Sequence, residues 1–305
     1  MKRKALITGS KGFVGPYLKS ELQANGYDVF GLGKEPGAEA GYLSVDITDT
    51  AGVRGALKKI EPTHIFHLAG VSSPPFAEKN PELTNQINVE GTRNILEAAL
   101  DLSTAPRVLV VSTAHVYGPA KYLPIDESHP LDGLGVYGLS RIQQEAVVRT
   151  FMKEMFIAIP RSFNHTGPGQ PDAFVIPKIF KQLAEINAGK REMLELGNID
   201  VKRDILHVSD VVRAYRLLLE QDMPGVVANV CRGVSVGLKE IISYGKMFAQ
   251  LSDVQIGIDK GGLRTNDTND LYGSNAYLKS VIDWEPTIGL EELSQEIYSY
   301  WRAKV

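Results

Sequence analysis

Short apolar runs alternate with longer segments of helical periodicity through the first half of the chain. Brief runs rich in Val, Ile and Leu are typical of strands buried on both faces of a parallel sheet. Between them, apolar residues recur at helical spacing, as Leu83, Ile87, Ile95 and Ala99 do. This alternation predicts βαβ units. The expected strands are 4–8, 28–32, 64–69, 107–112 and 156–160, and the expected helices are 13–25, 50–60, 81–101 and 137–154.

The rhythm changes in the second half, where shorter strands and helices are expected and two further helices close the chain. No linker rich in Pro, Gly or Ser separates the halves, so the second lobe should pack closely on the first. We expect a Rossmann-type, doubly wound parallel α/β sheet, mainly within 1–165, and a smaller C-terminal α/β substrate-binding lobe, mainly within 166–305 and interleaved with the first. The expected elements of the second half are helices 174–188 and 209–220 and strands 193–196, 202–207 and 226–230.

Composition narrows the class of protein. The 305 residues are 43% hydrophobic and 23% charged, which is typical of a soluble globular chain. A net charge of −3 does not suggest a nucleic-acid surface, and no apolar run is long enough to cross a membrane. The one cysteine, Cys231, has no partner for an internal disulfide, so we expect a cytoplasmic protein. The six histidines have no spacing typical of a metal site, and we expect none.

The segment TGSKGFVG follows the first expected strand and opens a helix. Gly9, Gly12 and Gly15 would let the backbone turn tightly and approach a pyrophosphate at the helix N-terminus. Glycines also serve ordinary tight turns, so three of them alone are weak evidence. Their place at the first strand–helix junction of an alternating chain favours dinucleotide binding.

The end of the second strand bears on which dinucleotide binds. An acidic residue there would hydrogen-bond the ribose of NAD, whereas a basic residue accommodates the extra phosphate of NADP. Here the chain has Gly33 and Lys34, and Lys11 adds a positive charge within the glycine segment. Both lysines could instead be solvated surface charges. Because the acidic residue is absent, the pattern favours NADP(H).

Tyr137 and Arg141 are four residues apart in an expected helix and would share one face. A phenol has a pKa of about 10, and a fixed cation beside it favours its ionised form. Arginine supplies the charge, but its planar fork differs from the ammonium of lysine. An isolated pair of this kind is more often a surface pair.

The pair is not isolated, because the preceding strand ends in VVSTAHVYG. This segment places the hydroxyls of Ser112 and Thr113 where strand ends form active sites. A hydroxyl, a phenol and a cation could then converge on one carbonyl oxygen. We expect Tyr117, in the same segment, to be structural.

Together these residues resemble the extended short-chain dehydrogenase/reductases that act on nucleotide sugars, most closely the GDP-4-keto-6-deoxy-D-mannose reductases. The resemblance extends over nearly the whole chain. The segments that carry it are TGSKGFVG, VDITD, HLAG, NVEGTRNILEAA, VVSTAHVYG, YGLSR, FNHTGPGQ, FVIPKIFKQLAEI, LELGNIDVKRDILHV and GSNAYLKSVIDWEP.

The resemblance implies a role for each matching residue. Thr113 would orient the substrate carbonyl, Tyr137 would donate a proton, and Arg141 takes the lysine position. For Arg203 and Arg264, a surface salt bridge remains an alternative to a diphosphate contact. The implied substrate contacts are Ser72, Thr113, Asn164, Arg203 and Arg264. The implied cofactor contacts are Gly9, Lys11, Gly12, Phe13, Val14, Gly15, Lys34, Asp46, Ile47, Leu68, Ala69, Gly70, Asn88, Tyr137 and Arg141.

Three departures from the family pattern matter. Arg141 replaces lysine, and no proline precedes Tyr137 in GLGVY. His115 stands two residues after Thr113, where sugar 4,6-dehydratases carry the glutamate that eliminates water. This last departure argues against dehydratase chemistry.

The leading hypothesis is an NADPH-dependent reductase of a nucleotide-linked 4-keto-6-deoxy sugar, with GDP as the favoured nucleotide. One alternative is a nucleotide-sugar 4-epimerase, although epimerases of this fold generally retain NAD. Another is a non-catalytic binding protein in which Arg141 marks lost chemistry. The family also implies a homodimer through helices 81–101 and 137–154, whose apolar faces could equally serve packing within one chain.

Overall fold

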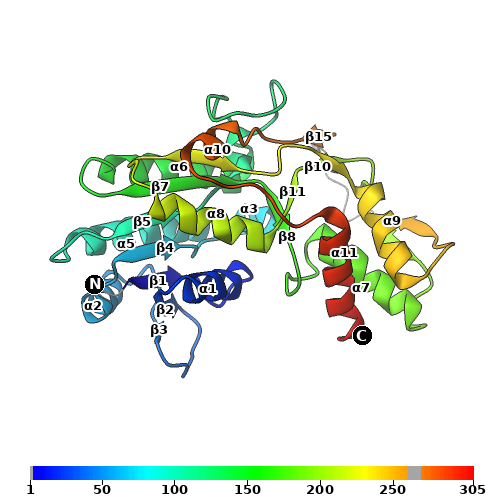
Figure 1. Ribbon diagram of the computed structural model, residues 1–305, viewed down its shortest axis with the longest axis horizontal. Coiled ribbons are helices and arrows are strands. Elements are labelled where there is room, and N and C mark those ends of the chain that lie inside the picture. The colour runs from blue at the N-terminus through cyan, green and yellow to red at the C-terminus, as the bar shows by residue number, and fades with distance from the viewer. Residues whose placement is uncertain (1–2, 260–268) are drawn as a thin grey trace.

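The computed structural model describes residues 3–259 and 269–305, which form a layered α/β protein (Figure 1). Eight strands make the main sheet in the order β12-β7-β5-β4-β1-β2-β3, with β6 beside β7, and every pairing is parallel. The predicted Rossmann-type fold class is confirmed. The strands are β1 (Lys4–Thr8), β2 (Asp28–Gly33), β3 (Tyr42–Ser44), β4 (His64–His67), β5 (Arg107–Val110), β6 (Ser112–Thr113), β7 (Ile157–Ser162) and β12 (Val227–Val230).

The strand order reverses at β1, which pairs with β2 on one side and β4 on the other. Ligands of doubly wound sheets bind beyond the carboxyl ends of the strands at such a reversal. Thr8 lies at this point, in register with Leu32 and His67. The segments that follow these three strands therefore frame the candidate site.

Helices cover both faces of the sheet, as the alternating side chains of β1 require. Ala5 and Ile7 pack under α1 (Val14–Ala24) and α8 (Val208–Glu220), whereas Leu6 faces the opposite layer. That layer consists of α2 (Thr50–Ile60), α5 (Gly91–Leu100) and α6 (Gly135–Phe151) (Figure 1). Thus α8 and β12, which come from the second half of the chain, complete the large sheet domain.

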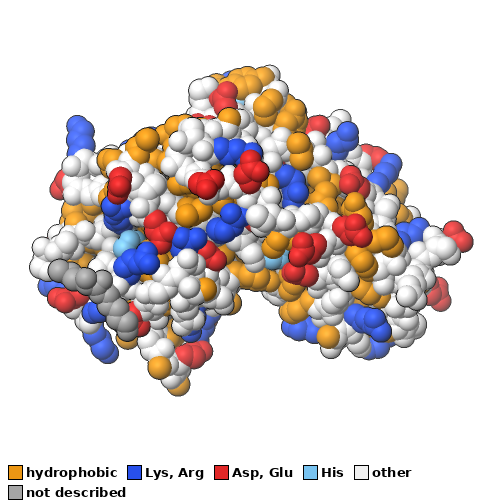
Figure 2. Space-filling model, in the orientation of Figure 1, with side chains coloured by type: hydrophobic (Ala, Val, Ile, Leu, Met, Phe, Trp, Pro, Cys, Tyr) orange, Lys and Arg blue, Asp and Glu red, His pale blue; other side chains and the backbone are white. Residues whose placement is uncertain are grey.

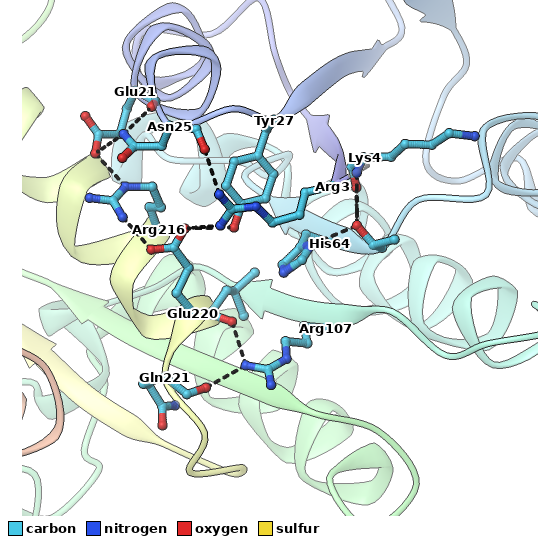
Figure 3. Close-up of polar contacts among 12 residues, drawn as sticks. Arg3, Lys4, Glu21, Asn25, Tyr27, His64, Arg107, Arg216, Glu220 and Gln221 are labelled. Atoms are coloured by element: carbon cyan, nitrogen blue, oxygen red, sulfur yellow. Dashed lines mark hydrogen bonds and ion pairs between the residues drawn. The ribbon is translucent and has the colours of Figure 1, made fainter. Parts of the chain in front are cut away.

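Ion pairs join α8 to the first half of the chain at the amino ends of the strands (Figure 3). Glu220 accepts from Arg3 at 2.8 Å, and the Nε of Arg216 lies 2.7 Å from a carboxylate oxygen of Glu21 in α1. Partly exposed pairs of this kind contribute little each. They lie at the edge opposite the candidate site, beside the apolar core that α8 covers.

A second lobe is built from α7 (Val175–Asn187), α9 (Leu238–Ala249) and α11 (Leu290–Arg302), around a core that includes Phe180, Leu183, Ile241 and Ile297. The space-filling outline is indented between this lobe and the sheet domain (Figure 2). The small strands of the second half pair as β8 (Asn164–Thr166) with β11 (Ile205–His207), β9 (Leu194–Leu196) with β14 (Ile256–Ile258), and β10 (Lys202–Arg203) with β13 (Val236–Gly237) and β15 (Asp270–Leu271).

Two expectations about helices need correction. The expected helix 81–101 is divided into α4 (Pro81–Asn85), a π-helical turn η1 (Gln86–Glu90) and α5. This π-helical turn contains Asn88, whose side-chain Oδ1 accepts a hydrogen bond from the Val71 amide at 2.7 Å. The π-helical turn therefore coincides with a polar contact that hydrophobic periodicity does not reveal. Three helices, not two, follow β12 in the described chain, because the short α10 (Ala276–Val281) precedes α11. Each helix within residues 3–259 and 269–305 is too short or too polar to cross a bilayer.

Candidate active site

The glycine segment between β1 and α1 has room only for glycine at two positions. Gly9 has a φ of 67°, and a Cβ there would lie 2.9 Å from the backbone of Ala69. A Cβ at Gly15 would lie 2.1 Å from the carbonyl oxygen of Ser10. Gly12, Phe13 and Val14 complete the entry into α1, so the free amides of the helix face the carboxyl edge of the sheet.

Lys11 lies beside the turn that follows β2. Its Nζ is 4.3 Å from the centre of the Tyr42 ring, donates to the Pro36 carbonyl at 2.8 Å, and lies 3.3 Å from a carboxylate oxygen of Glu39. A backbone hydrogen bond and then Lys11 hold the pKa of Glu39 below its usual range. Lys34, in the same turn, is exposed. Both lysines therefore belong to the region of the turn after β2, where the sequence pattern predicts a 2′-phosphate.

Asp46 and Ile47 follow β3, the strand that pairs with β2. The carboxylate of Asp46 accepts from the amide of Thr48 at 2.9 Å and from its hydroxyl at 2.8 Å. Ile47 is buried against Gly91, where a Cβ would lie 2.6 Å from its Cδ1. Both residues are therefore held in place, Asp46 exposed and Ile47 in the core.

Tyr137 and Arg141 lie side by side on α6, as their spacing predicts. The guanidinium carbon is 5.5 Å from the centre of the Tyr137 ring, and both side chains are buried, with 7% and 5% exposed. Arg141 donates to the carbonyl oxygens of Val71 at 3.0 Å and Val111 at 3.2 Å, and to Gln144 Oε1 at 2.9 Å. Its Nε is buried without a partner, and within the described chain it forms no ion pair with a carboxylate.

Gln144 connects Arg141 to a chain of buried polar groups. Arginine only donates, so the oxygen of the Gln144 amide must face Arg141 and its nitrogen must face Thr92 Oγ1, 2.8 Å away. Thr92 donates its own proton to the carbonyl of Asn88 at 2.7 Å. Hydrogen-bond accounting therefore fixes the orientation of the Gln144 amide.

The chain continues through His67 to the end of β1. Because Thr92 has already donated its proton, it must accept from His67 Nε2 at 2.9 Å. His67 Nδ1 then accepts from the Thr8 hydroxyl at 2.7 Å, and Thr8 Oγ1 accepts from the Ala69 amide at 3.2 Å. Burial and, after it, the charge of Arg141 lower the pKa of His67 to about 3, so the ring is neutral.

Leu68, Ala69 and Gly70 follow β4 and separate the glycine segment from Arg141. A Cβ at Gly70 would lie 2.8 Å from Arg141 Nη2 and 3.0 Å from Asn88 Oδ1. The amide nitrogen of Asn88 also donates to Ser140 Oγ at 3.0 Å. Asn88 therefore joins the segment after β4 to α6, and the guanidinium fills the space left by Gly70.

The two hydroxyls of β6 have different surroundings. Ser112 donates to Glu145 at 2.6 Å, and Arg161 donates to the same carboxylate through Nε at 2.9 Å and Nη2 at 2.8 Å. Burial opposes ionisation of Glu145, but Arg161 outweighs it and the pKa of Glu145 falls below its usual value. Thr113 accepts from the His115 amide at 3.3 Å, and no acceptor for its proton is found among the described residues.

His115 and Tyr117 follow in the 3₁₀ turn η2 (Ala114–Tyr117). The exposed ring of His115 packs edge-on against Tyr137, with ring centres 5.3 Å apart. Tyr117 is fully buried, donates to Asn229 at 2.6 Å and accepts from Arg161 at 3.1 Å, which agrees with its expected structural role. His115 thus contacts both Thr113 and Tyr137 at the carboxyl edge of the sheet.

The missing proline before Tyr137 has a structural counterpart. The helix α6 begins at Gly135, whose φ is 68°, and the amide of Val136 donates to Glu78 Oε1 at 2.8 Å. Glu78 belongs to the short helix α3 (Pro74–Lys79). A proline at this position would have no amide to satisfy, whereas here a carboxylate from a neighbouring helix caps the start.

The expected substrate contacts are less closely grouped. Ser72 is exposed in the loop after β4, and Asn164 is exposed at the start of β8. Asn164 is in register with Ile205, two residues after Arg203, so these two candidates lie on adjoining segments between the lobes. Arg203 also donates to the carbonyl of Lys202 at 2.8 Å. Arg264 lies outside the described residues.

These features fit a dinucleotide cofactor. The tight glycine segment leaves no room for side chains beside α1, and the buried, unpartnered Nε of Arg141 offers a donor near the ends of β4 and β6. The hydroxyl of Tyr137 has no hydrogen-bond partner in the described part of the chain. A group with ribose hydroxyls and a reactive carbonyl would meet these donors.

The chain is similar over nearly its whole length to known nucleotide-sugar enzymes. A family model described as GDP-mannose 4,6 dehydratase matches residues 6–297. GDP-6-deoxy-D-mannose reductase of Pseudomonas aeruginosa is 32% identical, in an alignment covering 100% of this chain and 99% of that protein. GDP-mannose 4,6-dehydratase of Vibrio cholerae is 27% identical, covering 97% and 93%. Fold and site together define an oxidoreductase of the short-chain dehydrogenase/reductase type that acts on nucleotide sugars. The chain belongs to the GDP-mannose 4,6-dehydratase family.

Solved structures support the same assignment. The structure of RMD from Pseudomonas aeruginosa, complexed with NADPH, has a TM-score of 0.90 at 31% identity and covers 99% of this chain and 100% of that one. The UDP-glucose 4-epimerase of Thermotoga maritima has a TM-score of 0.88 at 22% identity, covers 99% of each chain, and shares the fold. The family predicted from the sequence motifs is confirmed.

Proposed function

We propose that the protein is an NADPH-dependent reductase of a nucleotide-linked 4-keto-6-deoxy sugar, with GDP-4-keto-6-deoxy-D-mannose as the favoured substrate. The observation that carries the proposal is the buried cation of Arg141 beside the phenol of Tyr137, with no carboxylate partner for Arg141 in residues 3–259 and 269–305. The full-length similarity to a GDP-6-deoxy-D-mannose reductase supports the substrate class. His115, in place of the glutamate of the dehydratases, supports reduction over elimination.

The reaction needs a hydride on C4 of the sugar and a proton on its oxygen. NADPH, when bound, supplies the hydride. Tyr137 supplies the proton from its hydroxyl, and Thr113 donates a hydrogen bond to the same carbonyl oxygen, where negative charge develops. The guanidinium of Arg141 stabilises the phenolate that forms when Tyr137 gives up its proton, because the acceptors that hold the guanidinium in the described part of the chain are neutral. The ketone thereby becomes an alcohol.

The cofactor would be held by four groups of residues. The amides that follow Gly9 and Gly12 would bind the pyrophosphate, and Arg141 with Asn88 would lie at the nicotinamide ribose. Lys11 and Lys34 would bind the 2′-phosphate of the adenosine ribose, although Lys11 first has to leave Glu39. Asp46 and Ile47, with Leu68, Ala69 and Gly70, would line the remaining length.

The C-terminal lobe would bind the nucleotide sugar. Asn164 is a proposed contact to the nucleotide sugar, and Arg203 and Arg264 are the proposed contacts to its diphosphate. Ser72 would contact the substrate from the sheet domain. An arginine fork matches two phosphate oxygens, which suits the roles proposed for the two arginines. Residues 1–165 would thus mainly bind the cofactor and residues 166–305 mainly the nucleotide sugar. Both parts of the chain contribute strands to the main sheet.

We also propose a homodimer in the cytoplasm. Leu83 on α4 and Leu139 on α6 are 42% and 52% exposed, and an apolar surface of this kind suits a second copy of the same helices. Cys231 is buried and free, which suits a reducing compartment.

The test is to mix the purified protein with NADPH and GDP-4-keto-6-deoxy-D-mannose and to follow the absorbance of the reduced cofactor. We expect oxidation that falls about a hundredfold or more in Tyr137→Phe, as for loss of a general acid. Tyr117→Phe is the matched control, and should lose about 1–3 kcal/mol of stability while keeping its turnover.

Other results would favour the alternatives. NAD that stays bound through purification, with interconversion of C4 epimers and no net oxidation of NADPH, would indicate an epimerase. No turnover of any nucleotide sugar, in a protein that binds NADPH, would indicate a binding protein. Activity gained in Arg141→Lys would then locate the loss of chemistry at Arg141.

A further inference from the structure

Among the described residues, the charge of Arg141 is held by three neutral acceptors. Two are main-chain carbonyls, those of Val71 and Val111, and the third is the side-chain oxygen of Gln144. A buried guanidinium needs hydrogen bonds to offset its desolvation. Because these acceptors carry no charge, they fix the group in place without cancelling its positive field at Tyr137.

Gln144 is the one side chain among the three acceptors, and it is itself immobilised. It is 1% exposed, and Thr92 accepts from its amide nitrogen at 2.8 Å. The network through Thr92 and His67 leaves the Gln144 amide a single orientation, with its oxygen toward Arg141. Glu145, the next residue, is turned away from Arg141 into the ion pair with Arg161.

Gly70 contributes on the opposite side of the guanidinium. A Cβ there would lie 2.8 Å from Nη2 and 3.3 Å from Cζ of Arg141. A contact of 2.8 Å requires one of the two groups to shift, and the guanidinium is held by its hydrogen bonds to Val71, Val111 and Gln144, so a side chain at position 70 would displace it from this place. The ammonium of a lysine is a smaller head group than the planar fork of arginine.

We propose that Gln144 and Gly70 are positioning residues that let an arginine work where related reductases carry lysine: Gln144 holds the guanidinium and Gly70 leaves space for it. The proposal rests on the proposed roles of Tyr137 and Arg141. Both positioning residues act through Arg141 and not on the substrate.

The first test compares Gln144→Met with Gln143→Met. Methionine nearly keeps the volume of glutamine but cannot accept the Arg141 hydrogen bond, and Gln143 is the exposed neighbour on the same helix. We expect Gln144→Met to weaken NADPH binding and to lower kcat/KM. The combined loss should reach about a hundredfold, as for a misplaced catalytic group. Gln143→Met should match the wild type. Unchanged NADPH affinity and kcat/KM in folded Gln144→Met would overturn the proposal.

Gln144→Glu tests whether the neutrality of the acceptor matters, and it keeps the oxygen if Gln144→Met fails to fold. A carboxylate here would offset the positive field that Arg141 exerts at Tyr137, 5.5 Å away. We therefore expect kcat/KM to fall in Gln144→Glu, because the negative charge that develops on the phenol during proton transfer is then less stabilised. An unchanged kcat/KM in folded Gln144→Glu would count against the proposal.

The second test is a double-mutant cycle on Gly70→Ala and Arg141→Lys, read by fluorescence titration with NADPH. Each single variant should bind NADPH more weakly, and the double variant should bind better than the product of the two losses predicts, since lysine relieves the clash. Losses that simply multiply would overturn the role of Gly70, because the added methyl group would then act elsewhere, on Asn88 Oδ1 at 3.0 Å or on the cofactor. The titration uses no sugar, so its result does not depend on the substrate assignment. A wrong substrate assignment would affect only the turnover measurements.

Discussion

Ser112 donates a 2.6 Å hydrogen bond to Glu145, and this bond removes one of the two adjacent hydroxyls of β6 from the site. Glu145 is also bound by Arg161 in a fork of two hydrogen bonds, with both side chains almost fully buried. The ion pair between Glu145 and Arg161 thereby joins α6 to β7, and the Ser112 hydrogen bond joins the same carboxylate to β6. Thr113, one residue further along, keeps its hydroxyl for a ligand.

Neighbouring substitutions in β6 should therefore have opposite effects. Thr113→Val keeps the shape but removes the hydroxyl, and we expect turnover to fall about a hundredfold, as for loss of one oxyanion donor, with little change in stability. Ser112→Ala should cost about 1–3 kcal/mol of unfolding free energy because it removes a buried hydrogen bond to a charged carboxylate, while turnover is kept. Steady-state kinetics and urea unfolding check both. The reverse pattern would assign the ligand hydroxyl to Ser112.

Cofactor choice should depend on the turn after β2. In Lys34→Glu the phosphate of NADPH would meet a carboxylate, so the ratio of kcat/KM for NADPH over NADH should fall by about tenfold to a hundredfold, the worth of a charged hydrogen bond. Lys153→Glu is the matched control, since Lys153 is an exposed lysine just beyond α6, away from this turn. An unchanged ratio in Lys34→Glu would leave Lys11 as the phosphate ligand.

Oligomerisation should depend on the exposed face of α6. Leu139→Asp places a charge where we propose that a second copy packs, so the protein should elute as a monomer in size-exclusion chromatography with light scattering. Met223→Asp, at a residue that is also 50% exposed but lies after α8, should leave the dimer intact. A wild-type monomer would contradict the proposed dimer outright.

Acid should destabilise the protein through buried neutral histidines. Burial and Arg141 lower the pKa of His67 to about 3, and burial and Arg107 lower the pKa of His64 to about 4. Unfolded histidine titrates near pH 6.5, so below that pH the unfolded chain binds protons that the folded chain does not. Stability should therefore fall as the pH drops from about 6.5 toward 4, by up to about 1.4 kcal/mol per pH unit for each group.

His67→Gln tests this directly. The variant should be less stable at neutral pH, because it loses hydrogen bonds to Thr8 or Thr92, but its stability should decline less steeply in acid. Urea unfolding across the pH range measures the slope. An identical slope in variant and wild type would show that His67 does not carry the effect.

Sequence reasoning reached the groups that a local pattern can mark. Spacing predicted that Tyr137 and Arg141 share a helix face, and the structure places them together. The glycines of the first turn were predicted from their junction, and the structure adds the reason, which is the approach of Ala69 and Ser10. Such features depend on neighbours within a few residues, so the chain itself reveals them.

The residues that sequence reasoning missed depend on contacts between distant segments. Gln143 and Gln144 are identical side chains side by side, and only the packing of α6 against Thr92 makes one of them part of the site. The spacing of three between Arg141 and Gln144 was a signal, since it places both on one helix face. The π-helical turn at Asn88 left no such trace, because its polar contact is to Val71 across the fold.

The position of β12 has a consequence for folding. The chain leaves the large sheet after β7, builds α7 and the small strands of the second lobe, adds α8, and only then returns to place β12 against β7. A fragment ending at residue 165 would lack that edge strand and the helix over one face, which would expose Leu22, Ile7 and Ala158. Neither lobe is therefore a separable module, and the sheet that carries Tyr137 and Arg141 closes only when most of the chain has been made.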